Sequence, residues 1–89
     1  MAEIQVMPLG EGKFRVTVAE GSATNHTVSV LQTTLDQLNW SGTPEALIRA
    51  SFEFLLQREP KESILGEFEI LDIARYFPEF EEKARGGFG

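Results

Sequence analysis

The chain has 89 residues, a formal net charge of −6 and no cysteine. A chain of this length builds one hydrophobic core, so we expect a single domain over residues 1–85 and a flexible tail over residues 86–89. The absence of cysteine excludes disulfides, zinc–thiolate sites and thiol nucleophiles. The acid excess disfavours nucleic acid as a partner, because phosphate binding relies on clustered Lys and Arg, and the basic residues of this chain are scattered.

The N-terminal residues are not expected to form a signal peptide. Residues 1–6 lack the basic region and the long apolar run of a signal peptide. No apolar stretch approaches the roughly 20 residues that span a bilayer. We therefore expect a cytoplasmic protein without a membrane segment.

Three segments near the N-terminus alternate apolar and polar residues: residues 4–6, 14–18 and 26–30. This period of two, with many β-branched and aromatic side chains, predicts half-buried strands. A glycine-rich turn over residues 10–12 and a polar loop over residues 20–25 separate them, which favours an antiparallel meander. The apolar face of this sheet is expected to carry Phe14, Val16, Val18, Val28 and Val30.

The spacing of apolar residues then becomes helical. Thr33 or Thr34 is expected to cap a short helix that Gly42 closes. Thr43, Pro44 and Glu45 together predict the start of a longer helix: a capping hydroxyl, a proline at the first position and an acid at the positive end of the helix dipole. This helix is expected to end before residue 60 and to be the central buried helix.

Residues 60–80 combine aromatic and aliphatic side chains with acids. We expect a helical turn over residues 62–65, a helix over residues 69–77 that Pro78 stops, and a last turn over residues 80–84. Strands followed by helices predict an α+β fold, in which an N-terminal three-stranded antiparallel β-meander is covered on one face by C-terminal helices.

The residues that could serve in catalysis, metal binding or phosphate binding are better explained by structural roles. His26 is the only histidine and lies inside a predicted strand. Glu67, Glu69 and Asp72 are neighbours, but acids interleaved with apolar residues on a helix are typical of a solvated face, and no calcium-loop spacing is present. The Gly10–Lys13 segment precedes a strand and not a helix, so it is a turn and not a phosphate loop. We predict no catalytic residue, no cofactor, no metal ligand and no enzymatic activity.

The helix that ends at residue 77 carries the best candidate for a partner surface. Tyr, Phe and Arg are favoured in the centres of protein interfaces. We assign this hypothetical surface to Arg75, Tyr76 and Phe80. The alternative is that the aromatic side chains of this region, Tyr76 and Phe77 among them, cover the open face of the sheet.

Two segments are distinctive enough to compare with known families. Residues 52–65 read Phe-Glu-Phe-Leu-Leu-Gln-Arg-Glu-Pro-Lys-Glu-Ser-Ile-Leu, and residues 73–80 read Ile-Ala-Arg-Tyr-Phe-Pro-Glu-Phe. They resemble a family of small bacterial proteins of unknown function, and the resemblance covers most of the chain from His26 onward. It implies a compact bacterial α+β domain with no assigned activity, cofactor or site.

A second resemblance concerns residues 27–56, where a strand, a helix, a glycine-containing turn and a longer helix follow one another. This order is similar to that of ribbon-helix-helix DNA-binding modules. In that family, strands of two subunits pair and place polar side chains in the major groove, and the matching positions here are Thr27 and Ser29. This strand carries no Lys or Arg, which departs from the pattern of the family.

Three functional hypotheses follow. The first is a non-catalytic domain that acts through contacts with an unidentified protein partner. The second is a ribbon-helix-helix-like regulator or antitoxin, which requires a dimer. The third is a small enzyme that uses its acidic residues. We favour the first hypothesis, because no catalytic motif is present and fold analogy does not determine function. We also favour a monomer over a homodimer.

Overall fold

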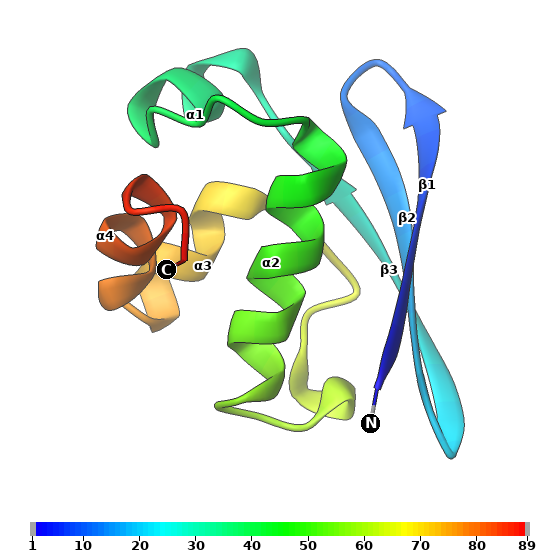
Figure 1. Ribbon diagram of the computed structural model, residues 1–89. Helices are drawn as coiled ribbons and strands as arrows, with labels where there is room; N and C mark the ends of the chain where they lie inside the picture. Colours follow the sequence, from blue (N-terminus) through cyan, green and yellow to red (C-terminus); the bar gives the residue numbers. More distant parts are fainter. Residues whose placement is uncertain (1, 89) are drawn as a thin grey trace.

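The computed structural model describes residues 2–88, and Figure 1 shows strands on one side and helices on the other. The sheet has the order β1-β2-β3-β4, with β1 (Glu3–Gly10), β2 (Lys13–Glu20) and β3 (Ser22–Ser29) antiparallel and β4 (Glu67–Glu69) parallel to β3. The helices are α1 (Gln32–Gln37), α2 (Pro44–Leu56), α3 (Ile73–Tyr76) and α4 (Glu79–Arg85). The predicted α+β fold, with its antiparallel meander and its helical cover, is confirmed.

The first three strands are longer than their alternating patterns predicted. The segment expected to be a polar loop pairs with β2 instead, with Ala23 opposite Ala19 and Asn25 opposite Thr17. Gly21, at φ 80°, makes the turn, a conformation that glycine adopts without a steric penalty. Asn25 accepts a hydrogen bond from the Thr17 hydroxyl across the strands, which shows how its polar side chain is accommodated in the sheet.

Strand β4 was not predicted, and the helix expected over residues 69–77 is correspondingly shorter. Glu69 ends β4, a 3-10 turn follows over Ile70–Asp72, and α3 begins at Ile73. The Thr27 N–H donates to the Gly66 carbonyl at 2.8 Å, which begins the pairing with β3. Three residues are too few to reveal a period of two, so only the pairing partner identifies this strand.

Helix α2 begins as the sequence predicts. The Thr43 hydroxyl accepts the Ala46 N–H, Pro44 is the first helical residue and Glu45 lies in the first turn. Helix α1 differs from the prediction, because Leu31 precedes it and no side chain caps it. Thr34 is a buried residue inside α1, where its hydroxyl contacts a distant carboxylate and not the helix end.

The core lies between the sheet and the helices. Val16, Val18 and Val28 of the sheet and Leu47, Ile48 and Phe52 of α2 are completely buried, in agreement with the predicted apolar faces. The other buried apolar side chains belong to every part of the chain: Ile4, Phe14, Val30, Leu38, Phe54, Leu55, Ile64, Phe68, Ile70, Ile73, Phe80 and Ala84.

Both edges of the sheet carry features that interrupt their rows of free backbone groups. On β1, Arg49 donates to the Ile4 carbonyl, and Pro8 has no N–H to offer to an added strand. On β4, the Asp72 carboxylate accepts the N–H of Glu69 at 3.1 Å. Short strands, prolines and side-chain caps of this kind are known to prevent association between sheet edges.

The segment after α4 is the part that the sequence predicts to be a flexible tail, and in the structure Gly86 and Gly87 are exposed while Phe88 is partly buried. Gly87 has φ 73°, its N–H donates to the Ala84 carbonyl, and the Phe88 N–H donates to the Lys83 carbonyl. This pair of hydrogen bonds is the Schellman arrangement that ends many helices. The Phe88 side chain packs on the core. Gly89, the last residue of the expected tail, lies outside the described residues.

The central position of Phe52 generates a stability prediction. Its ring contacts strands β3 and β4, with its centroid 5.4 Å from the ring centroid of His26 and 6.0 Å from that of Phe68. We expect Phe52→Ala to lower the free energy of unfolding by about 3–5 kcal/mol, because the cavity it leaves is fully enclosed. Chemical denaturation measures this loss, with the exposed Met7→Ala as the control that should change stability by less than about 0.5 kcal/mol. A loss of similar size in both variants would place the core elsewhere.

Candidate functional site

A groove lies between the end of α2, the 3-10 turn Lys61–Ser63, β4 and α3. It encloses about 80 Å³, and its walls are largely apolar. Two of its lining residues are unusually exposed for large apolar side chains, Leu65 at 47% and Tyr76 at 64%. The full lining is Leu55, Glu59, Ser63, Leu65, Phe68, Asp72, Ile73, Tyr76 and Phe77.

The structure separates the three residues of the predicted partner surface. Tyr76 is exposed and lines the groove, and Arg75 is exposed beside it on α3 without lining the groove. Phe80 is completely buried, and its ring centroid lies 5.4 Å from that of Phe54. Phe80 therefore belongs to the core and not to a partner surface, because α4 turns this side chain toward α2.

The groove also contains residues that the sequence interpretation did not select. Leu65 stands next to buried Ile64, and the two are indistinguishable by residue type. Glu59 follows α2, in a segment where the sequence predicts only the end of the helix. Only the fold shows that these side chains meet Tyr76 at one place on the surface.

The surroundings of the groove are acidic. Two acidic residues, Glu59 and Asp72, are among those that line it. Residues 59–79, which supply most of the groove, contain six acidic and two basic residues, so this segment holds most of the excess negative charge of the chain. An apolar hollow with an acidic border favours a ligand that is apolar at its centre and positively charged around it.

His26 fixes one wall of the groove. Its side chain is almost fully buried, and its Nδ1 lies 2.7 Å from the carbonyl oxygen of Leu65. Because a carbonyl oxygen only accepts, Nδ1 carries a proton and donates it to this bond. The other ring nitrogen, Nε2, lies 2.9 Å from the Thr24 hydroxyl. Both ring nitrogens thus have structural partners, and the contact ties the segment around Leu65 to β3.

Glu69 joins the groove segment to α1. One carboxylate oxygen accepts the Thr34 hydroxyl at 2.7 Å and the Leu31 N–H at 3.1 Å, and the other accepts the Leu71 N–H at 2.8 Å. Asp72 in turn accepts the Glu69 N–H. Two members of the acidic cluster seen in the sequence therefore act as hydrogen-bond acceptors for the backbone. Among residues 2–88, no group of three His, Asp or Glu side chains is placed to hold a metal ion.

Lys61 is a buried basic residue close to the groove. Its ammonium group pairs with the carboxylate of Glu62, whose side chain is mostly exposed. The hydrogen bond from Lys61 lowers the pKa of Glu62 below its ordinary value, and a backbone hydrogen bond acts in the same direction. A hydrogen bond from the Glu79 backbone likewise lowers the pKa of Glu79, with help from the Arg58 side chain.

Comparison of this chain with protein-family models, with curated proteins and with solved structures gives no match. Both family resemblances therefore remain predictions from the sequence. Within the described part of the chain, no helix has the length and the apolar character needed to cross a membrane.

The contacts of Glu69 predict a structural role that can be measured. Glu69→Ala leaves the Thr34 hydroxyl and two N–H groups without their acceptor, so we expect a loss of about 1–3 kcal/mol in the free energy of unfolding. Glu67→Ala, two positions away on the same strand and exposed, should change it by less than about 0.5 kcal/mol. Equal effects of the two substitutions in urea denaturation would contradict the role assigned to Glu69.

The pairing of Lys61 and Glu62 predicts a change in titration. Lys61→Met removes the hydrogen bond that chiefly lowers the pKa of Glu62, so this pKa should rise toward its ordinary value. In the wild type, the stabilisation from this pair is present at neutral pH and is lost as the pH falls through the lowered pKa of the folded state. An NMR titration of the Glu62 carboxyl measures the shift, and an unchanged midpoint in Lys61→Met would show that the ion pair does not form.

Proposed function

We propose that this protein is a non-catalytic binding domain that docks a segment of another protein at the groove beside Tyr76. The observation that carries the proposal is the exposure of Leu65 and Tyr76, which both line an apolar hollow. A cavity of about 80 Å³ accommodates a single aliphatic side chain. The partner is therefore expected to insert one apolar residue, with Leu65 and Tyr76 covering its sides.

The charge of the groove supports a basic partner segment. Lys or Arg residues next to the inserted side chain would lie close to the carboxylates of Glu59 and Asp72. Such contacts accelerate encounter and select the partner more than they add affinity, and dissolved salt weakens them. A site with one apolar anchor favours transient association.

The edges of the sheet support two parts of the proposal: the partner is recognised through side chains and not by strand pairing, and the domain is a monomer. Arg49 and Pro8 protect β1, and Asp72 protects β4, so neither edge offers a full row of free backbone groups to a partner strand. The ribbon-helix-helix hypothesis receives no support, because β3 pairs with β2 on one side and β4 on the other. The enzyme hypothesis receives none from His26 and Glu69, whose polar atoms have structural partners.

The remaining expectations belong to the same proposal. We place this docking domain in the cytoplasm, and the cysteine-free composition supports that location. We assign it a bacterial origin, which rests on the resemblance of residues 52–65 and 73–80 to a family of small bacterial proteins.

Peptide selection tests the docking function. Wild-type protein presented with a random peptide library should enrich peptides that carry an apolar residue flanked by Lys or Arg. Tyr76→Ser removes one wall of the groove. It should lower the affinity for the enriched peptides by about tenfold or more, as measured by fluorescence polarisation. Higher ionic strength should lower the affinity of the wild type for these peptides, because salt screens the attraction between opposite charges.

Met7→Ser is the matched control, because Met7 is about as exposed as Tyr76 (60% against 64%) and lies on β1. The affinity of the selected peptides should not change in this variant. Selection of peptides without basic residues, or equal binding to Tyr76→Ser and wild type, would refute docking at the groove.

A further inference from the structure

Three aromatic side chains, Trp40, Phe54 and Phe80, surround the ring of Phe88. The ring centroid of Phe88 lies 6.1 Å from that of Trp40, 6.3 Å from that of Phe54 and 5.8 Å from that of Phe80. Tilted and edge-on arrangements at these distances are the favourable geometries for aromatic pairs. The three side chains come from separate parts of the chain and together form a site for one aromatic ring.

Contacts that do not involve Phe88 hold this aromatic site in place. The Trp40 Nε1–H donates to the Thr43 carbonyl at 2.9 Å, which orients the indole ring. Phe80 packs directly on Phe54. The walls of the site therefore have their own supports.

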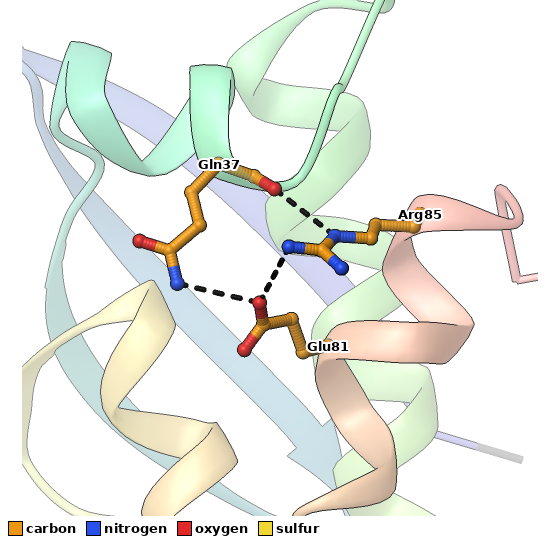
Figure 2. A network of polar contacts seen from close by, with 3 residues as sticks. All are labelled: Gln37, Glu81 and Arg85. Atoms are coloured by element: carbon orange, nitrogen blue, oxygen red, sulfur yellow. Dashed lines mark hydrogen bonds and ion pairs between the residues drawn. The ribbon is translucent and has the colours of Figure 1, made fainter.

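A polar network fixes α4 against α1, the two helices next to the site. Figure 2 shows Arg85 donating to the backbone carbonyl of Gln37 and to the carboxylate of Glu81, which also accepts from the Gln37 side chain. The distance from Arg85 Nε to the Gln37 oxygen is 3.1 Å, and that from its Nη2 to Glu81 is 2.8 Å. These bonds keep the spacing between Trp40, which follows α1, and Phe80 on α4.

Phe88 itself is held less firmly than the walls around it. It follows the last turn of α4 and is only partly buried. Its φ angle of 61° is a left-handed conformation that bulky side chains rarely adopt. The backbone bonds that position it close the end of a seven-residue helix, and helix ends open more readily than their centres.

Two hollows lie at the aromatic site, and Phe88 lines the first of them. One hollow of about 190 Å³ is lined by Phe54, Arg58, Lys83 and Phe88 among others, and a second of about 270 Å³ is lined by Trp40, Ala84 and Gly87 among others. A segment that approaches the aromatic site therefore has room for its backbone next to the ring that it inserts.

We propose that Trp40, Phe54 and Phe80 form a second docking site, which binds an aromatic side chain of a partner protein, and that Phe88 is the resident occupant displaced by it. The occupant already present shows the chemistry that the site accepts: a benzyl side chain on a chain of glycines, Gly86-Gly87-Phe88. Displacement exchanges one aromatic ring for another and relieves the left-handed conformation of Phe88. This site is separate from the groove, which Leu65 and Tyr76 border.

Peptide binding with Phe88→Ala tests the second site. The probe is acetyl-Gly-Gly-Phe-Gly-amide, and the signal is the fluorescence of Trp40, the only tryptophan of the chain. The peptide should bind Phe88→Ala at least about tenfold more tightly than wild type, because a tethered competitor acts at an effective concentration in the millimolar range. Acetyl-Gly-Gly-Ala-Gly-amide should bind neither protein. Adding Tyr76→Ser to Phe88→Ala should leave the affinity unchanged.

Equal affinity of wild type and Phe88→Ala, or equal binding of the two peptides, would overturn the proposal. A loss of binding on addition of Tyr76→Ser would show that the peptide binds at the groove, and this result would also overturn the proposal. If Phe88→Ala does not fold, hydrogen exchange of the wild type decides. Saturating Phe peptide should then speed exchange of the Phe88 amide, which donates to Lys83, and leave that of Phe52 in α2 unchanged. An unaltered Phe88 amide would refute displacement.

Discussion

Burial of one face of an antiparallel sheet is the constraint on which the other features of this structure depend. Val16, Val18 and Val28 point to that face, and α2 covers them with Leu47, Ile48 and Phe52. A sheet of this kind is stable only if its apolar face is removed from water, at roughly 25 cal/mol per Å² of apolar surface. Because one helix is too narrow to cover the sheet, the segment from Lys61 to Tyr76 contributes further buried side chains, Ile64, Phe68, Ile70 and Ile73. Helix α4 packs on α2 and α3, on the side away from strands β1 to β3 (Figure 1).

The residues that the sequence offers as candidates for catalysis or metal binding hold these parts of the fold together. His26 joins β3 to the Leu65 carbonyl, and Glu69 joins β4 to the beginning of α1. Each contact gives a backbone group a hydrogen-bond partner, the Leu65 carbonyl in the first case and the Leu31 N–H in the second, and it also pairs the polar side chain itself. Among the described side chains that are not exposed, no buried nitrogen or oxygen atom lacks a hydrogen-bond partner. Of the buried polar side chains, His26 and Thr34 connect distant segments, whereas Ser51 donates within α2 to the Leu47 carbonyl.

Incomplete cover explains both proposed docking sites. The groove remains where β4 and α3 end beside α2, and its border of Leu65 and Tyr76 is apolar surface that the fold does not bury. The aromatic site lies where α1 and α4 meet α2, and Phe88, which occupies it, is only partly buried. A small domain has few side chains with which to close such gaps, so the same limit on size that makes the fold simple leaves places for partners.

Local patterns of the sequence determined the central elements of this protein. The alternation in β2 and β3 and the cap, proline and acid that open α2 act between near neighbours, so their structural meaning can be recognised without the fold. The tertiary structure alone decided that Phe68 lies in a strand, that Phe80 is buried while Tyr76 is exposed, and that Phe88 packs on Trp40. These outcomes depend on contacts between segments about 40 residues apart, such as Leu31 with Glu69. Residue type and spacing show that a side chain is apolar, but only the distant segment that meets it determines whether it is buried.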